Sequence, residues 1–89
     1  MKITETIKVS ERTKEFKFDN GAWASVCIFP EDGDGSWEYQ RDEDDEETYL
    51  EGSLWLNGKV VDYDGCYDLP TEVVLAIKEC GYNVNDLED

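Results

Sequence analysis

The most conspicuous chemistry in this sequence is a run of six consecutive carboxylates at residues 42–47. Residues 31–51 contain eleven acidic residues and one basic residue, Arg41, which gives this segment a net charge of −10. The first 17 residues, in contrast, contain five basic and three acidic residues. The negative charge is therefore concentrated in one segment, which indicates an anionic surface that attracts cations or cationic proteins.

Catalysis is not indicated by the residue types present. The chain has no histidine, the commonest general base and metal ligand. No glycine-rich phosphate loop ends in Lys-Ser or Lys-Thr. The serines at 10, 25, 36 and 53 have no base pattern beside them. With 23 acidic residues, any chosen carboxylate pair is uninformative. We therefore expect a protein that is not an enzyme and has no cofactor.

Calcium binding around residues 32–43 is an alternative use of the carboxylates. If Asp32 is position 1 of an EF-hand-like loop, Asp34, Ser36 and Glu43 fall at positions 3, 5 and 12, and all four supply oxygen ligands. Position 6 requires glycine for a sharp turn, and Trp37 occupies it. The flanking patterns also indicate strands, whereas an EF-hand has two helices.

Composition indicates one folded domain and limits its partners. The chain has 89 residues, of which 39% are hydrophobic and 12% aromatic, more apolar material than a disordered acidic tail carries. Its 23 acidic and 8 basic residues give a net charge of −15. We therefore expect no direct binding to nucleic acid or to an anionic membrane, since both repel a polyanion.

The expected location is the cytoplasm. The sequence has no apolar run long enough to span a membrane, and its first residues lack the pattern of a secretory signal. Cys27, Cys66 and Cys80 form no C-x-x-C pair. An odd number of cysteines without a signal indicates reduced, packed thiols and no metal site.

Two Asn-Gly pairs predict β-hairpins. Residues 2–9 alternate as a strand, and residues 13–29 fold at Asn20-Gly21 so that Phe18 pairs with Trp23. This register predicts one core face made of Phe16, Phe18, Trp23, Ser25, Cys27 and Phe29. Residues 48–67 fold at Asn57-Gly58. Their predicted core face contains Leu50, Leu54, Leu56, Lys59, Val61 and Tyr63, with Trp55 and Val60 on the other face.

Punctuation in the remaining chain predicts loops and one helix. Residues 30–36 and 41–48 are expected to form acidic loops, with a strand beginning at Trp37. A helix of about eleven residues is capped by Asp68 or Leu69, with Pro70 in its first turn, and stops at Gly81. Its predicted buried stripe contains Leu69, Val73, Ala76, Ile77 and Cys80. Residues 85–89 are expected to fray.

These elements predict an α+β fold, an antiparallel sheet of four to five strands with one C-terminal helix packed on a face. The acidic segment is the candidate partner-binding site. Six carboxylates in an extended chain are about 3.3 Å apart, close to the roughly 3.4 Å phosphate spacing of one DNA strand. A strand-like or tightly turned segment would therefore approximate its charge density. The predicted site contains Glu31, Asp32, Asp34, Glu38, Asp42, Glu43, Asp44, Asp45, Glu46, Glu47 and Glu51, flanked by the aromatic contact candidates Trp37, Tyr39 and Tyr49.

A short, histidine-free chain that carries DEDDEE on a small sheet-plus-helix frame resembles the DNA-mimic inhibitors of phages and mobile elements, such as anti-CRISPR and anti-restriction proteins. The resemblance implies an inhibitor that occupies the cationic nucleic-acid groove of a nuclease or regulator, within a bacterial host if the chain is phage-encoded. Such proteins share no sequence pattern, so no functional residue is transferred from them. A structural or interaction module that binds through sheet-face aromatics is the alternative.

We predict that added salt, or mild acidification towards about pH 5, raises the melting temperature. Both changes weaken the repulsion among the carboxylates of a chain with net charge −15. Thermal melts followed by circular dichroism at low and high salt test this. A melting temperature that falls with salt would show that specific ion pairs outweigh the repulsion.

Overall fold

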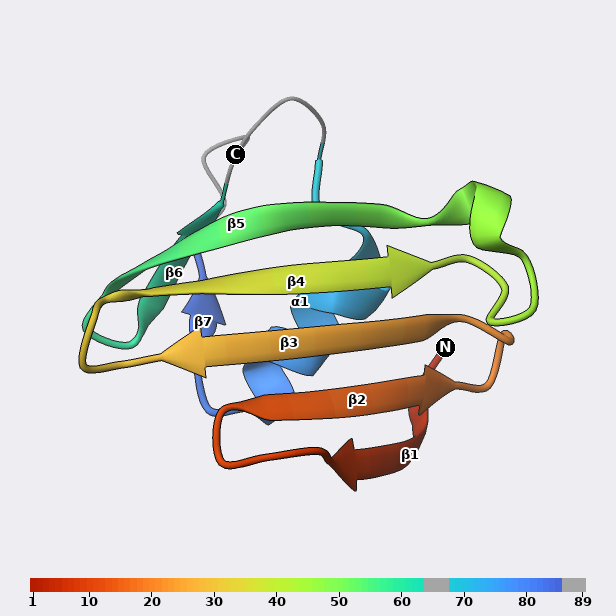
Figure 1. Cartoon of the computed structure of the whole chain (residues 1–89), viewed down its shortest axis with the longest axis horizontal. Coiled ribbons are helices and arrows are strands. Elements are labelled where there is room, and N and C mark those ends of the chain that lie inside the picture. Colours follow the sequence, from red (N-terminus) through yellow and green to blue (C-terminus); the bar gives the residue numbers. More distant parts are fainter. Residues whose placement is uncertain (64–67, 86–89) are drawn as a thin grey trace.

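A curled sheet wrapped around one helix makes up this protein (Figure 1). The structure is a computed structural model that describes residues 1–63 and 68–85. The strands are β1 (Ile3–Lys8), β2 (Thr13–Phe18), β3 (Trp23–Phe29), β4 (Asp34–Gln40), β5 (Leu50–Asn57), β6 (Val60–Tyr63) and β7 (Asn83–Val84), and the helices are the short 3₁₀ helix η1 (Glu46–Thr48) and α1 (Thr71–Glu79). The predicted fates of Cys66, of the second hairpin beyond Tyr63 and of residues 86–89 lie outside the described residues.

The α+β class is confirmed, but the predicted number of strands was wrong. The sheet has seven strands in the order β1 to β7, each next to its neighbour in sequence. Strands β1 to β6 pair antiparallel, and β7 lies parallel to β6. β7 has two residues, too few for a sequence pattern to show. It is anchored by backbone hydrogen bonds from Asn83 N to Lys59 O and from Asn85 N to Val61 O, both 2.8 Å.

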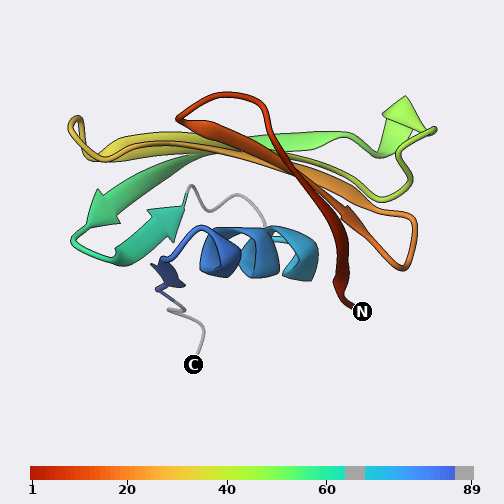
Figure 2. The ribbon, with the colours of Figure 1, turned by 90° about the horizontal axis from the view of Figure 1, so that it is seen from below.

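The helix lies in the concave side of the sheet, and the convex side has no second layer in the described chain (Figure 2). Among the described residues α1 is nine residues long, and no helix is long and apolar enough to cross a membrane. The largest fully buried side chains come from both layers. They are Phe16, Val26, Trp37, Leu54 and Val61 from the sheet, and Val73 and Ile77 from α1.

The register of the first hairpin differs from the prediction by one residue. Lys17 pairs with Trp23 and Phe16 with Ala24, because the loop contains three residues, 19–21. Gly21 takes a φ of +90°, as expected for the last residue of a three-residue hairpin loop. A one-residue shift exchanges the two faces of a strand.

The shift corrects the predicted core face of β3. Ala24, Val26 and Ile28 are buried beside Phe16 and Phe18. The residues predicted to join them, Trp23, Ser25, Cys27 and Phe29, belong to the convex face, although neighbouring side chains cover Ser25.

The second hairpin keeps its predicted faces with a different turn. Asn57 pairs with Val60, so the turn residues are Gly58 and Lys59, and Lys59 is not on the core face. The shift amounts to two residues, which preserves the alternation. The predicted core positions Leu54, Leu56, Val61 and Tyr63 are fully or partly buried in the core, whereas Trp55 and Val60 are exposed. Leu50 is 36% exposed at the start of β5.

Helix α1 confirms the predicted stripe and stop signal. Leu69, Val73, Ala76 and Ile77 are buried, Cys80 is partly buried, and Gly81 ends the helix with a φ of +93°. The predicted cap was wrong: Pro70 is the N-cap residue and no side chain caps the helix. The sequence also did not predict that Glu72 is buried.

Glu72 ties the start of α1 to the first hairpin. Its side chain accepts a hydrogen bond from Asn20 Nδ2 at 3.0 Å, and the residue is 9% exposed. The Asn20 side chain also accepts a bond from Ala22 N at 3.0 Å. The Asn-Gly loop therefore positions the helix as well as turning the chain.

Trp37 is the largest fully buried side chain, and Gly52 makes room for it. These residues are opposite each other on β4 and β5. A Cβ atom on Gly52 would lie 2.6–2.8 Å from three atoms of the Trp37 indole. Since Trp37 is 1% exposed, its ring has no free space to move into.

We predict that Gly52→Ala destabilises the protein by about 1–3 kcal/mol, the usual cost of overpacking a core. Urea unfolding monitored by circular dichroism measures the change. Ser53→Ala is the matched control, because Ser53 is exposed on the same strand. Wild-type stability in Gly52→Ala would mean that the indole moves aside at no cost.

Candidate protein-binding surface

The acidic run lies in a folded loop, residues 41–48, between β4 and β5. Backbone bonds run from Asp45 N to Asp42 O at 2.9 Å and from Thr48 N to Asp45 O at 3.2 Å. The Asp45 side chain caps η1 by accepting a bond from Glu47 N at 3.1 Å, and Asp42 accepts one from Asp44 N at 3.0 Å. Two of the carboxylates thus shape the loop that carries them.

The same loop is attached to the end of the sheet, beside the loop of the first hairpin (Figure 1). Glu43 N donates to Gly21 O at 3.2 Å. Gln40 Nε2 lies 3.2 Å from both Asp42 O and Glu43 O, and Arg41 N donates to Thr48 Oγ1 at 3.1 Å. These bonds give the carboxylates a defined place relative to the sheet.

The carboxylates form a compact group and not a line. The loop contains a turn and a 3₁₀ helix, in which each residue advances the chain by about 2.0 Å. A strand-like spacing of about 3.3 Å therefore does not apply, because the chain reverses direction between β4 and β5. Asp45 is half-buried and the other five acids of the run are exposed.

Little of this charge is neutralised within the protein. In the described chain two ion pairs join side chains: Lys17 Nζ lies 3.5 Å from Glu43 Oε2, and Arg12 pairs with Glu31. The other acids of the run, Asp42 and residues 44–47, form no ion pair with the described basic residues. The loop therefore presents a net negative surface.

A second anionic feature lies beside the loop on the convex face, where Glu38 and Glu51 are directly opposite each other. Like charges in this position destabilise a sheet. The Tyr49 hydroxyl lies 2.9 Å from Glu38 Oε1 and 3.2 Å from Glu51 Oε1. Partial burial, then the hydrogen bond to and the charge of Glu38, and then Glu51 raise the pKa of the Tyr49 phenol.

The predicted site residues are divided among several places. Residues 42–47 occupy the loop, Glu38 and Glu51 lie next to it, and Tyr49 joins them. Glu31 and Asp32 are in the β3–β4 turn at the other end of β4. This turn is shorter than the predicted loop over residues 30–36, because Asp34 already begins β4 and its hydrogen bonds to both neighbours.

Trp37 and Tyr39 are corrections to the predicted contact surface. Trp37 is 1% exposed and Tyr39 is 9% exposed, and both belong to the core beneath α1. Alternation along β4 explains this, because Glu38 is on the convex face and its two neighbours are on the concave face. Burial is also the leading cause of the raised pKa of Tyr39, followed by the charge of Glu72.

The calcium alternative loses its geometric basis. β4 extends from Asp34 to Gln40, which separates Asp32 and Asp34 from Glu43 by about 20 Å of strand. Within residues 1–63 and 68–85 there is no group of three or more His, Cys, Asp or Glu that could hold a metal ion.

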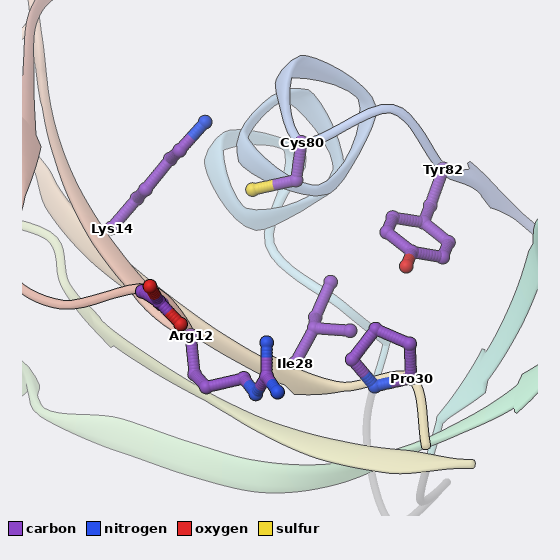
Figure 3. A pocket seen from close by; sticks show the side chains of 7 residues that line it. Arg12, Lys14, Ile28, Pro30, Cys80 and Tyr82 are labelled. Carbon is purple, nitrogen blue, oxygen red and sulfur yellow. The ribbon is translucent and has the colours of Figure 1, made fainter.

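A hollow of about 170 Å³ lies at the opposite end of the molecule from the acidic loop (Figure 3). Arg12, Lys14, Cys80 and Tyr82 contribute to its lining. Burial raises the pKa of the Cys80 thiol, although Lys14 opposes this effect, so the thiol is protonated near neutral pH and is not an activated nucleophile. The two ends of the protein thus differ in charge.

Sequence reasoning missed the exposed aromatics as candidate contact residues. Trp55 is 48% exposed and Phe29 is 37% exposed, and both are on the convex face. The alternation of the second hairpin did place Trp55 opposite the core face, which is the signal that could have identified it.

No known protein family, curated protein or solved structure matches this chain. Its function is therefore argued from the geometry and charge of its own residues.

We predict that Tyr49→Phe lowers stability near neutral pH, because Glu38 and Glu51 lose the hydroxyl between them. The folded-state pKa of Tyr49 is raised above its ordinary value of 10.0. The hydroxyl's contribution is thus fully present below this value and is lost as the pH rises above it. Urea unfolding of both proteins at about pH 8 and about pH 11 measures the difference. A difference that does not shrink at the higher pH contradicts the assignment.

Proposed function

We propose that this protein is a non-enzymatic inhibitor that binds a basic, nucleic-acid-binding protein through its acidic loop, residues 41–48. The carboxylates of the loop would take the place of phosphates in a site lined by Lys and Arg. One observation carries this proposal. Six consecutive carboxylates are held in a hydrogen-bonded loop, and one of them has an ion-pair partner among the described residues.

The energetic argument concerns charge that is kept together without neutralisation. Two carboxylates about 7 Å apart in water repel each other by about 0.6 kcal/mol, and the loop contains several such pairs. Glu38 and Glu51 add a further facing pair beside it. A cationic surface that approaches the loop removes this repulsion and replaces it with attraction, so binding gains what the free protein lacks.

The net charge of −15 supports the same kind of partner. It repels nucleic acid and anionic membranes and accelerates encounter with a basic protein. The composition-level resemblance to DNA-mimic inhibitors agrees with this proposal. In this reading a nuclease or regulator loses access to its nucleic acid while the protein is bound.

The second candidate function is an interaction module that docks through the apolar part of the convex face. The exposure of Trp55, Phe29 and Val60 favours it, at 48%, 37% and 37%. Trp37 and Tyr39 do not contribute, since they are buried. Binding of this kind would depend little on salt, whereas binding through the acidic loop weakens as salt screens the charges.

We predict that replacing Asp44, Asp45 and Glu46 with Asn, Asn and Gln weakens partner binding about tenfold, from three exposed charge contacts of a few tenths to 1 kcal/mol each. Asn at position 45 retains the ability to cap η1, so the loop keeps its shape. The partner is first captured from lysate at low salt and identified. Its affinity is then measured between about 50 and 300 mM salt.

The matched control replaces Glu5, Glu11 and Glu79 with Gln. These residues are exposed and lie outside the acidic loop, and the variant has the same net charge of −12, since each triple change removes three of the fifteen excess negative charges. Equal affinity of the two variants for the partner, or affinity that does not change with salt, would refute binding through the loop.

A further inference from the structure

We infer that the convex face contains a second contact for the same partner, a slot in which an arginine side chain of that protein stacks on Trp55 beside Asp34. The inference rests on the proposed function, because it names a further recognition point for a basic protein. It uses residues about 20 Å from the acidic loop, at the other end of β4.

Strand register builds the slot. Phe29, Asp34 and Trp55 are direct cross-strand neighbours on β3, β4 and β5. Such neighbours have Cβ atoms about 5 Å apart on the same face, so the carboxylate lies between the two aromatic side chains. A hollow of about 260 Å³ is found here, and Ser36 and Ser53 also line it.

The residues of the slot are available to a partner. Trp55 is 48% exposed and Phe29 is 37% exposed. Asp34 is exposed and forms no ion pair with any basic residue in the described chain. On its other side Trp55 faces Asp62 of β6, whose carboxylate accepts a 2.7 Å bond from Asn85 Nδ2. The indole therefore has a carboxylate on each neighbouring strand.

This arrangement fits a planar cation. A guanidinium group can stack on an indole and at the same time donate hydrogen bonds in its plane to a carboxylate. Lysine carries a compact charge and can satisfy one of these interactions well but not both. Phosphates and carboxylates of a partner are repelled by Asp34 and Asp62, and a neutral side chain gains nothing from them.

The slot is continuous with the acidic surface. From the loop towards the slot, the facing pairs on β4 and β5 are Glu38 with Glu51, Ser36 with Ser53, and Asp34 with Trp55. This sequence of polar pairs forms a track along the convex face. A partner that uses both ends must carry basic residues over a surface at least about 20 Å long.

The test uses N-acetyl-arginine amide as the probe, titrated into the ¹⁵N-labelled full chain and followed by NMR. Matched titrations use N-acetyl-lysine amide and N-acetyl-citrulline amide, which has nearly the shape of the arginine probe without its charge. We expect saturable shifts of the Trp55 indole N–H, at about threefold lower concentration for arginine than for lysine, and none for citrulline. Shifts spread over the acidic loop without Trp55, or equal binding of lysine or citrulline, would overturn the slot.

Variants separate stacking from general charge. Trp55→Leu and Asp34→Asn should each weaken arginine binding about threefold or more. Trp23→Leu is the matched control, because Trp23 is on the same face but next to Lys17 and Gln40. Circular dichroism shows whether each variant is folded. Loss of arginine binding in Trp23→Leu to the same degree as in Trp55→Leu would refute the assignment to Trp55.

The two proposals fail in different ways. If arginine misses Trp55 while partner affinity depends on salt and on Asp44, Asp45 and Glu46, the slot is wrong and the proposed function stands. If arginine saturates at Trp55 while the loop variant binds the partner like wild type, the slot is correct and the proposed use of the acidic loop is wrong.

Discussion

The structure depends on burial of one concave sheet face against one short helix. α1 has nine residues, and with Leu69 just before it supplies Val73, Ala76 and Ile77 to a core whose other side chains come from the sheet. A chain with net charge −15 must offset substantial self-repulsion, and this apolar contact is the main source of the required stability. The curl of the sheet is what allows a single helix to cover so many strands (Figure 2).

That arrangement determines which surfaces are free for binding. Because the helix occupies the concave side, acidic and aromatic side chains that alternate with core residues are left on the convex side. The indole of Trp37 fills the space above Gly52 in the core, whereas its neighbour Glu38 faces Glu51 in solvent. Core packing and charge presentation are thus two consequences of the same alternation.

The distribution of charge gives the molecule a direction. The loop of residues 41–48 and the facing pair Glu38 and Glu51 lie towards one end of the sheet, and a hollow with Arg12 and Lys14 lies at the opposite end. Hydrogen bonds from Gln40 and to Gly21 hold the acidic loop in place. A fixed loop loses less conformational entropy on binding than a mobile one, which favours a specific complex over nonspecific attraction.

Local sequence signals predicted the elements that depend on neighbouring residues. The alternation along 60–63, the spacing of Val73, Ala76 and Ile77, and Gly81 each reflect constraints within a few residues, and each prediction was confirmed. The concentration of acids in residues 42–47 was likewise visible without coordinates.

Tertiary structure decided what depends on register and on distant partners. One additional loop residue after Phe18 exchanged the faces of β3. Pairing with β6 created β7 from two residues, and the bond from Asn20 explained why Glu72 is buried. The sequence by itself thus determined the fold class and the charge. Which side chains meet the solvent depended on hydrogen-bond pairing between strands, since a shift of one residue moves every side chain to the opposite face.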